Sequence, residues 1–234
     1  MIPNISPSDI SNNEAIFIWL DILGFSEALE DGKSYEKLHI LLDSFLKTFL
    51  SDKRYDLQVI SDGIILKIDS KDPNEIREIF EEIATKQFQF ILKEKYFIRG
   101  GIAVGSHFTT RDGENLFLMG NGLSRAVKME AKVVNHAVIG TNDKVMEQIR
   151  SACALDEDDE QFGLKKTVNE NGDILYFIDF LQKDIDLENM LHSQLNTNKE
   201  NPIIQKKYLW IYRYYINKFG NTNRPFDDVL GVLL

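Results

Sequence analysis

The sequence predicts an α+β domain in which a central, mostly antiparallel sheet of ferredoxin-like order is flanked by helices, followed by a C-terminal hairpin and a helical extension. Three observations support this prediction. An apolar run ends abruptly on a carboxylate, a tight hairpin follows one helix later, and a glycine-containing strand follows a second helix. In a ferredoxin-like sheet the first strand and the hairpin can lie side by side.

The first strand is Ile16 to Leu20, a run of β-branched and aromatic residues that is typical of a strand buried on both faces. The run stops at Asp21, and a Gly24-Phe25 turn follows shortly after it. Tyr35 to Phe49 carries leucine and phenylalanine at helical spacing, which predicts the first long helix.

The remaining elements of the domain follow from the same spacing, capping and turn signals. They are a hairpin of Leu57 to Ile60 and Ile64 to Ile68 about Ser61-Asp62-Gly63, a helix from Asp72-Pro73 to about Lys93, a strand from Tyr96 to Val104, a helix from Gly120 to Val133, a strand-like segment Ala137 to Ile139, and a helix from Asp143 to Ile149.

The C-terminal part predicts a second hairpin, in which strands Leu164 to Val168 and Ile174 to Phe180 flank an Asn171-Gly172 turn. A final helix near Ile203 to Phe219 carries too many aromatic side chains for one buried stripe. We therefore divide the chain into a domain of residues 1–182 and an extension of residues 183–234, which packs on the same domain or on a second subunit.

Composition limits the classes of partner. The chain has 234 residues and a net charge of -10, which argues against a nucleic-acid or anionic-membrane surface. No apolar run approaches the length of a membrane span, and the first residues lack the basic and apolar regions of a signal peptide. The one cysteine, Cys153, excludes an intrachain disulfide and fits a reducing compartment. We therefore expect a cytoplasmic protein.

Asp21 and Asp62 are the candidate metal ligands. A charge that ends a buried strand is costly unless it is paired, and a cation is the obvious partner. If the first strand lies beside the hairpin, Asp21 faces Asp62, and two converging carboxylates with a nearby backbone carbonyl are a typical site for Mg²⁺ or Mn²⁺. Taken singly, Asp21 could simply cap the next helix and Asp62 could be an ordinary turn residue. Their pairing favours the metal.

Four segments resemble motifs of the class III nucleotidyl cyclases. Asp21 to Phe25 is similar to their Asp-Ile-x-Gly-Phe, and Ser61-Asp62 is similar to their hairpin Gly-Asp. Arg99 to Gly105 resembles their Arg-x-Gly-Ile-x-x-Gly strand, and Gly120 to Glu130 resembles their Gly-x-x-Val-Asn-x-Ala-x-Arg-x-Glu helix. The resemblance spans about residues 16–149 and implies a class III cyclase domain.

The resemblance implies two ions of Mg²⁺ or Mn²⁺ per site, held by Asp21, Asp62 and the backbone carbonyl of Ile22. These ions would bind a nucleoside triphosphate, lower the pKa of its ribose 3′-hydroxyl and hold the leaving pyrophosphate, so that a cyclic nucleotide forms. The Gly24-Phe25 turn would offer backbone N–H groups to the phosphates, and Arg99 would also contact the nucleotide. Family members form head-to-tail homodimers with sites at the interface, so a lone subunit would be inactive.

The helix motif departs from the family at two positions. The family's transition-state Asn falls on Ser124 and its Arg falls on Lys128. Serine can still donate a hydrogen bond and lysine keeps the charge, but lysine cannot make the bidentate contact of a guanidinium. Arg125 could partly substitute. Alternatively, Arg125 and Lys128 lie on a solvated helix face.

The two positions that select the base in the family carry neither the residues of adenylyl cyclases nor those of guanylyl cyclases. The Lys of adenylyl cyclases and the Glu of guanylyl cyclases fall on Gln58, and the second selector falls on Phe117. An amide can pair with uracil or, when flipped, with cytosine, and Phe117 either narrows the site towards a single ring or belongs to the core. This combination resembles the pyrimidine cyclases of bacterial Pycsar anti-phage systems. The resemblance implies that UTP, or next CTP, becomes a cyclic nucleotide that activates a separate effector.

Two other interpretations stay open. One is a catalytically inactive, cyclase-like module that binds a nucleotide and regulates a partner, which the altered Ser124 and Lys128 favour and the retained aspartates oppose. The other is a purine (adenylyl) cyclase with a rearranged base site, which Gln58 and Phe117 oppose.

Overall fold

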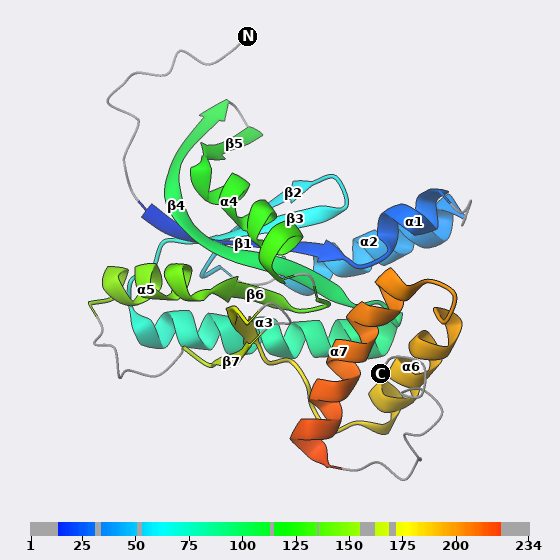
Figure 1. The fold of residues 1–234 in the computed structure, drawn as a ribbon. Coiled ribbons are helices and arrows are strands. Elements are labelled where there is room, and N and C mark those ends of the chain that lie inside the picture. The colour runs from blue at the N-terminus through cyan, green and yellow to red at the C-terminus, as the bar shows by residue number, and fades with distance from the viewer. Residues whose placement is uncertain are drawn as a thin grey trace.

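A computed structural model of the chain contains one sheet with helices on both of its faces (Figure 1). The structure describes residues 14–30, 34–50, 53–112, 115–134, 136–154, 162–168 and 172–220, and within these ranges residues 27, 108–119 and 203 are described by their backbone alone. None of the described helices combines the length and the apolar character needed to cross a bilayer.

The elements alternate along the chain. The strands are β1 (Glu14–Ile22), β2 (Asp56–Ile60), β3 (Gly63–Ile68), β4 (Ile98–Asp112), β5 (Asn115–Gly120), β6 (Ile139–Asn142), β7 (Leu164–Val168) and β8 (Ile174–Ile178). The helices are α1 (Phe25–Glu30), α2 (Tyr35–Phe49), α3 (Pro73–Glu94), α4 (Asn121–Met129), α5 (Asp143–Ala152), α6 (Ile185–Thr197) and α7 (Pro202–Phe219), with a π-helical turn, η2 (Glu130–Val134), directly after α4.

The strands follow the order β2-β3-β1-β4-β6-β8-β7, and the far end of β4 pairs with β5. β4 and β6 run parallel, whereas the other described pairs are antiparallel. The part β2-β3-β1-β4 is the predicted ferredoxin-like arrangement, in which the hairpin lies beside the first strand. This confirms the fold class and places the two predicted metal ligands near the same edge of β1.

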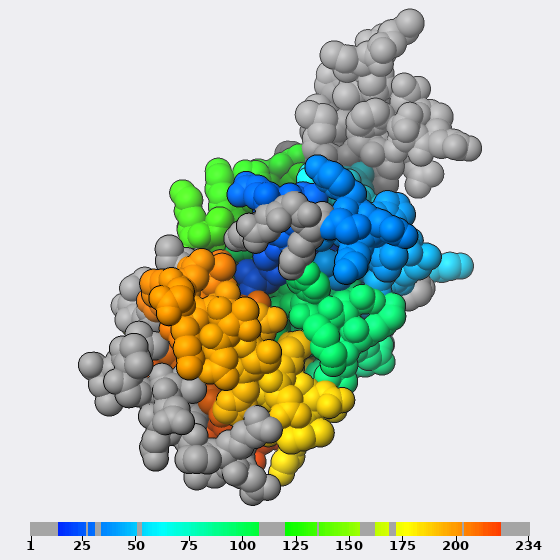
Figure 2. All heavy atoms as spheres, turned by 90° about the vertical axis from the view of Figure 1, so that its right-hand side faces the viewer, coloured from blue at the N-terminus to red at the C-terminus, as the bar shows by residue number. Residues whose placement is uncertain are grey.

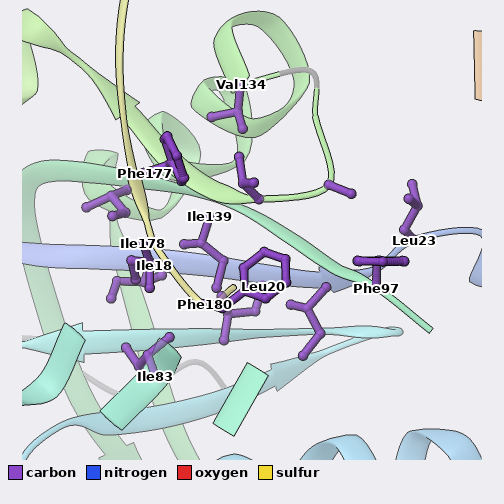
Figure 3. Packing of buried hydrophobic residues seen from close by; sticks show 14 of the residues in the cluster. Ile18, Leu20, Leu23, Ile83, Phe97, Val134, Ile139, Phe177, Ile178 and Phe180 are labelled. Atoms are coloured by element: carbon purple, nitrogen blue, oxygen red, sulfur yellow. The ribbon is translucent and has the colours of Figure 1, made fainter. Parts of the chain in front are cut away.

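Side chains of β1 alternate between two hydrophobic clusters, because successive residues of a strand point to opposite faces. Ile18 and Leu20 enter the main core, where Figure 3 shows them with Ile83 of α3, Ile139 of β6 and Ile178 of β8. A smaller cluster lies on the opposite face, beneath α4, and contains Ala15, Phe17, Ile65, Ala103 and Ala126. The first strand is therefore buried on both faces, as predicted.

The boundaries of several elements differ from the prediction. β4 continues past Val104 to Asp112 because its end leaves β1 and pairs with β5, a strand that was not predicted. The predicted helix of residues 120–133 consists of α4 and η2. Ala137 and Val138 precede β6, since the paired residues of this strand begin at Ile139. Helix α6 was not predicted either.

The aromatic residues of α7 are directed largely towards its own chain. Tyr208, Tyr212 and Tyr215 are buried. Trp210 and Tyr214 are half-buried and both make edge contacts with Phe177 of β8. Figure 2 shows the yellow and orange atoms of the C-terminal helices beside the green atoms of α3, which α6 contacts. Packing within the chain therefore accounts for most of this aromatic content.

Candidate active site

Strand register places the predicted site residues on one face of the sheet. Residues that pair directly across neighbouring antiparallel strands share a face, and Asp21 of β1 pairs with Arg99 of β4. Trp19 lies two residues before Asp21 and therefore on the same face. Ile65 of β3 pairs with both Trp19 and Gln58, so Gln58 belongs to this face too. Helix α4 covers part of the same face.

Asp21 is buried at the end of β1 with a side-chain partner on the adjacent strand. Only 8% of its surface is exposed. Arg99 donates hydrogen bonds from Nε and Nη2 to Oδ2 of Asp21, over 2.9 and 2.7 Å. Burial raises the pKa of Asp21 above its ordinary value, Arg99 opposes that rise, and the negative charge of Asp62 adds to it. Strand register agrees with this effect, because Asp21 pairs with Gly63, the residue directly after the half-buried Asp62.

A third carboxylate, Glu130, completes this charged group. Its Oε1 lies 3.0 Å from Nη1 of Arg99, so one guanidinium bridges Asp21 and Glu130. Burial raises the pKa of Glu130, Arg99 and Lys207 of α7 oppose the rise, and Asp21 adds to it. Glu130 was not among the predicted site residues. The available signal was its position as the last residue of the cyclase-like helix motif.

Two glycines permit the close packing around these groups. A Cβ atom on Gly101 would lie 2.2 Å from the carbonyl oxygen of Ala126 and 2.5 Å from the backbone nitrogen of Glu130, so α4 and η2 approach β4 closely there. A Cβ on Gly63 would lie 2.2 Å from Cη2 of Trp19, so the indole ring covers the strand directly after Asp62. Trp19 was not predicted to belong to the site.

The group fits a divalent cation in charge and in ligand type. Asp21, Asp62 and Glu130 carry three negative charges, against the positive charge of Arg99 and that of Lys207 beside Glu130. Carboxylate and carbonyl oxygens are the ligands that Mg²⁺ and Mn²⁺ prefer. Within the described ranges no group of three or more His, Cys, Asp or Glu side chains is arranged to hold a metal ion. A cation would therefore depend on Asp21 and Asp62 together with backbone oxygen, such as the carbonyl of Ile22 at the end of β1.

The predicted transition-state residues lie on α4, away from the sheet. Gly122 and Ala126 of α4 are buried, whereas Ser124 and Lys128 are exposed on the opposite side of the helix. Arg125 is exposed, and its Nη1 donates a hydrogen bond of 2.9 Å to the carbonyl oxygen of Val104. The structure therefore does not direct Ser124 and Lys128 towards the sheet of their own chain.

The predicted nucleotide-binding residues are dispersed around the carboxylates. Gly24 has a φ of +83°, and α1 begins at Phe25, whose side chain is buried in the core. Only the backbone of this turn can therefore face a ligand. Gln58 is half-buried on the site face. Phe117 lies in β5 opposite Thr110, and its side chain lies outside the described residues.

Solved structures with the same arrangement include a bacterial light-regulated adenylyl cyclase, with a TM-score of 0.52 and 13% identity over 87% of this chain. This chain spans 60% of the length of that cyclase. The adenylyl cyclase CyaB from P. aeruginosa gives a TM-score of 0.51 and 13% identity over 74% of this chain and 96% of CyaB. The chain has the class III cyclase fold.

This cyclase fold confirms the fold that the four sequence motifs imply. No protein-family model matches the chain, and no curated protein matches it in sequence. At 13% identity the likeness to the two adenylyl cyclases concerns the fold.

Proposed function

We propose that this chain is a nucleotidyl cyclase that converts a pyrimidine nucleoside triphosphate, UTP in preference to CTP, into its 3′,5′-cyclic nucleotide and pyrophosphate. The observation that supports the proposal is the pairing of Asp21 with Gly63, which places Asp62 beside the end of β1 within a cyclase fold. Carboxylates that repel each other beside a buried strand end are costly for a fold, and they are expected where a cation must bind.

The proposed mechanism assigns a task to each group of the chain. Asp21, Asp62 and the Ile22 carbonyl would hold Mg²⁺ or Mn²⁺, two ions per site. Such ions would lower the pKa of the ribose 3′-hydroxyl and neutralise charge on the triphosphate. The backbone of the Gly24-Phe25 turn and the Arg99 guanidinium bind the phosphates. The 3′-hydroxyl gives its proton to solvent water, its oxygen bonds to the α-phosphorus, the bond between the α-phosphorus and the oxygen bridging to the β-phosphate breaks, and pyrophosphate leaves.

The active form is a homodimer in this proposal. Ser124 and Lys128 are exposed on the side of α4 that faces away from its own sheet. We propose that they act on the site of a second copy, where Lys128 offers positive charge to the transition state and Ser124 offers a hydrogen bond. Arg125 is a weaker candidate for this role, because its guanidinium already binds Val104 of its own chain.

Gln58 is the proposed base selector. Its place on the site face supports this assignment, because an amide there can pair with N3–H and O4 of uracil. The second candidate function is an adenylyl cyclase, since both structures compared above are adenylyl cyclases. We further propose, from the resemblance to the Pycsar cyclases, that the product is a second messenger in anti-phage defence and activates a separate effector.

The decisive experiment offers ATP, GTP, CTP and UTP separately to the purified protein in Mn²⁺ and identifies the products by mass spectrometry. Cyclic UMP or cyclic CMP is expected, and Asp62→Ala should abolish it. Asp43→Ala is the matched control, because Asp43 is exposed on α2 and pairs with Lys47. Cyclic AMP alone would establish the adenylyl cyclase instead. No product from any nucleotide would favour the inactive regulatory module.

A further inference from the structure

We propose that Arg99 is an internal counter-ion that occupies Oδ2 of Asp21 until a divalent cation binds there, and that Glu130 then retains the displaced guanidinium. Glu130 is thus a positioning residue for Arg99. The inference rests on the proposed function of Asp21 as a metal ligand, and it adds the exchange that accompanies coordination of Oδ2 by the cation.

The hydrogen bonds on Asp21 lead to the first part of this proposal. Arg99 Nε and Nη2 both donate to the same oxygen, Oδ2, over 2.9 and 2.7 Å. A carboxylate oxygen has about two lone-pair sites, so Arg99 uses both sites of Oδ2. A cation that coordinates this oxygen must therefore displace at least one of the two Arg99 hydrogen bonds.

The third nitrogen of the guanidinium leads to the second part. Nη1 of Arg99 lies 3.0 Å from Oε1 of Glu130. This contact does not involve Asp21, so it can persist when the other two hydrogen bonds break. Without Glu130, the displaced and half-buried guanidinium would lose the second of the two carboxylates that it bridges, and separating a half-buried charge from its counter-charge is unfavourable inside a protein. Glu130 therefore lowers the cost of releasing Asp21.

Local backbone structure places Glu130 for this task. Glu130 is the first residue of the π-helical turn η2, and single π-turns within helices occur frequently at functional sites. The absence of a side chain at Gly101 lets this turn approach β4, since a Cβ there would lie 2.5 Å from the Glu130 nitrogen. Glu130 is 8% exposed, so its charge needs a partner in every state of the site.

The charges of the group favour exchange over simple addition. Asp21, Asp62 and Glu130 carry three negative charges, and a divalent cation at Oδ2 adds a second positive charge beside that of Arg99. If Arg99 kept both hydrogen bonds to Asp21, the cation and the guanidinium would compete for one oxygen at close range. If Arg99 leaves Oδ2 and keeps its contact with Glu130, the cation neutralises the aspartates, and Nε and Nη2 of Arg99 become available to the phosphates.

The test follows Arg99 directly and needs no nucleotide. The full chain is labelled with ¹⁵N-arginine and titrated with Mg²⁺, and the Arg99 Nε–H resonance is assigned from its loss in Arg99→Lys. We expect this resonance to shift on Mg²⁺ binding and its hydrogen exchange to accelerate. Asp62→Asn should suppress the shift because the cation loses a ligand.

A second measurement gives the size of the competition. Mn²⁺ affinity, determined by electron paramagnetic resonance of the free ion, should rise by roughly tenfold in Arg99→Met, because charged hydrogen bonds no longer have to be broken. Lys132→Met is the matched control, since Lys132 is an exposed cation in the same turn η2. Its effect on Mn²⁺ affinity should stay below about twofold, as expected for a screened surface charge.

The outcomes separate this inference from the proposed function. Mn²⁺ binding with an unmoved Arg99 resonance, or equal effects of Arg99→Met and Lys132→Met, would overturn the counter-ion role and leave the metal site standing. Failure of the wild-type chain to bind Mn²⁺ at all would overturn both the metal site and the counter-ion role. Product formation from UTP by a chain in which Arg99 never moves would overturn the inference alone.

Discussion

Lys128 is the side chain that the proposed mechanism assigns to charge stabilisation in the transition state. It is exposed on α4 at the position where the resemblance expects an arginine. A lysine ammonium is a point charge, whereas a guanidinium presents two parallel donors to a phosphate. The proposed transition state therefore gains charge from Lys128 but little directional hydrogen bonding.

Lys128→Arg should consequently raise kcat for cyclic nucleotide formation by several-fold, because a bidentate contact forms mainly in the transition state. The measurement is the initial rate of cyclic UMP formation in Mn²⁺ at saturating UTP. Lys132→Arg, an exposed neighbour on η2, is the control and should leave the rate unchanged. A rate that falls in Lys128→Arg would indicate that Lys128 is fitted to its site by size and does not need a second donor.

At the scale of elements, Gly101 determines how α4 meets the sheet. Its missing side chain is the space into which the Ala126 carbonyl and the Glu130 nitrogen enter. Gly101→Ala should destabilise the fold by about 1–3 kcal/mol, as overpacking in a filled core does, and should impair metal binding by displacing Glu130. Urea denaturation with and without Mn²⁺ measures both effects.

Gly172→Ala provides the comparison for Gly101→Ala. Gly172 has a φ of +86°, and nothing lies within 4 Å of a Cβ placed on it. Gly172→Ala should lower the free energy of unfolding through backbone strain alone, by about 1–2 kcal/mol. It should leave Mn²⁺ binding unchanged. Equal behaviour of the two variants would contradict the close approach of η2 to β4.

The hairpin of β2 and β3 contains a buried lysine that gives stability a defined pH dependence. Lys67 Nζ lies 2.7 Å from Asp69 and 2.9 Å from Asp56. Burial alone would lower the pKa of Lys67, but hydrogen bonds to the two aspartates outweigh it and raise the pKa above 10.5. Because the folded pKa exceeds the unfolded one, the stabilisation is complete below pH 10.5 and is lost as pH rises through the folded value.

Lys67→Met should therefore lower the free energy of unfolding by about 1–2 kcal/mol at neutral pH, and the difference from wild type should narrow above pH 10.5. Urea titrations between neutral and strongly alkaline pH measure the trend. Lys47→Met is the control, since Lys47 and Asp43 form an exposed pair that contributes little. A difference that stays constant across the alkaline range would show that Lys67 acts through packing of its methylene chain.

An element could be predicted best where its own residues contain the signal, such as a capping residue at the start of a helix. Asp72 before Pro73 predicted the start of α3, and the Asp72 side chain accepts a hydrogen bond from the Asn74 nitrogen over 2.9 Å. The start of β6 could not be predicted, because Gly100 and Gly101 of a distant strand define its paired residues. Long-range pairing of this kind leaves no periodicity in the short segment itself.

The candidate site was also difficult to predict where it depends on contacts between residues that are distant in sequence. Asp21 and Asp62 were predicted as a pair because ferredoxin-like order places their elements side by side. The contact of Arg99 with Asp21 spans 78 positions and depends on exact strand register. Glu130 reaches this pair only because α4 approaches β4 at Gly101. The sequence therefore allowed Asp21 and Asp62 to be proposed as a pair, but it did not indicate that Glu130 lies beside Arg99.

At the scale of the whole molecule, the proposed homodimer divides each active site between two chains. Asp62→Ala removes a metal ligand from a chain's own site, whereas Lys128→Met removes a donor to the partner's site. Each variant alone should be nearly inactive. Co-expression should restore about a quarter of wild-type activity, because half of randomly paired dimers are mixed and each has one intact site of two.

The complementation is measured as cyclic nucleotide formed per total chain, with the Asp43→Ala chain in place of one partner as a mixing control. Restored activity should also fall on dilution, as dimers dissociate. Full activity of Lys128→Met alone, or no restoration from the mixed pair, would contradict a site shared between subunits.

The parallel pairing of β4 with β6 has a consequence for how the molecule is made. Parallel neighbours require a crossover connection, and the chain from β5 through α4 and η2 supplies it. During synthesis the N-terminal half emerges first, so β1 to β4 can pair while α4 is still unmade. The nascent chain then holds Asp21 and Arg99 together before Glu130 exists. It also exposes the apolar face of Phe17, Ile65 and Ala103 that α4 later covers, which makes this interval the one in which aggregation and chaperone binding are expected.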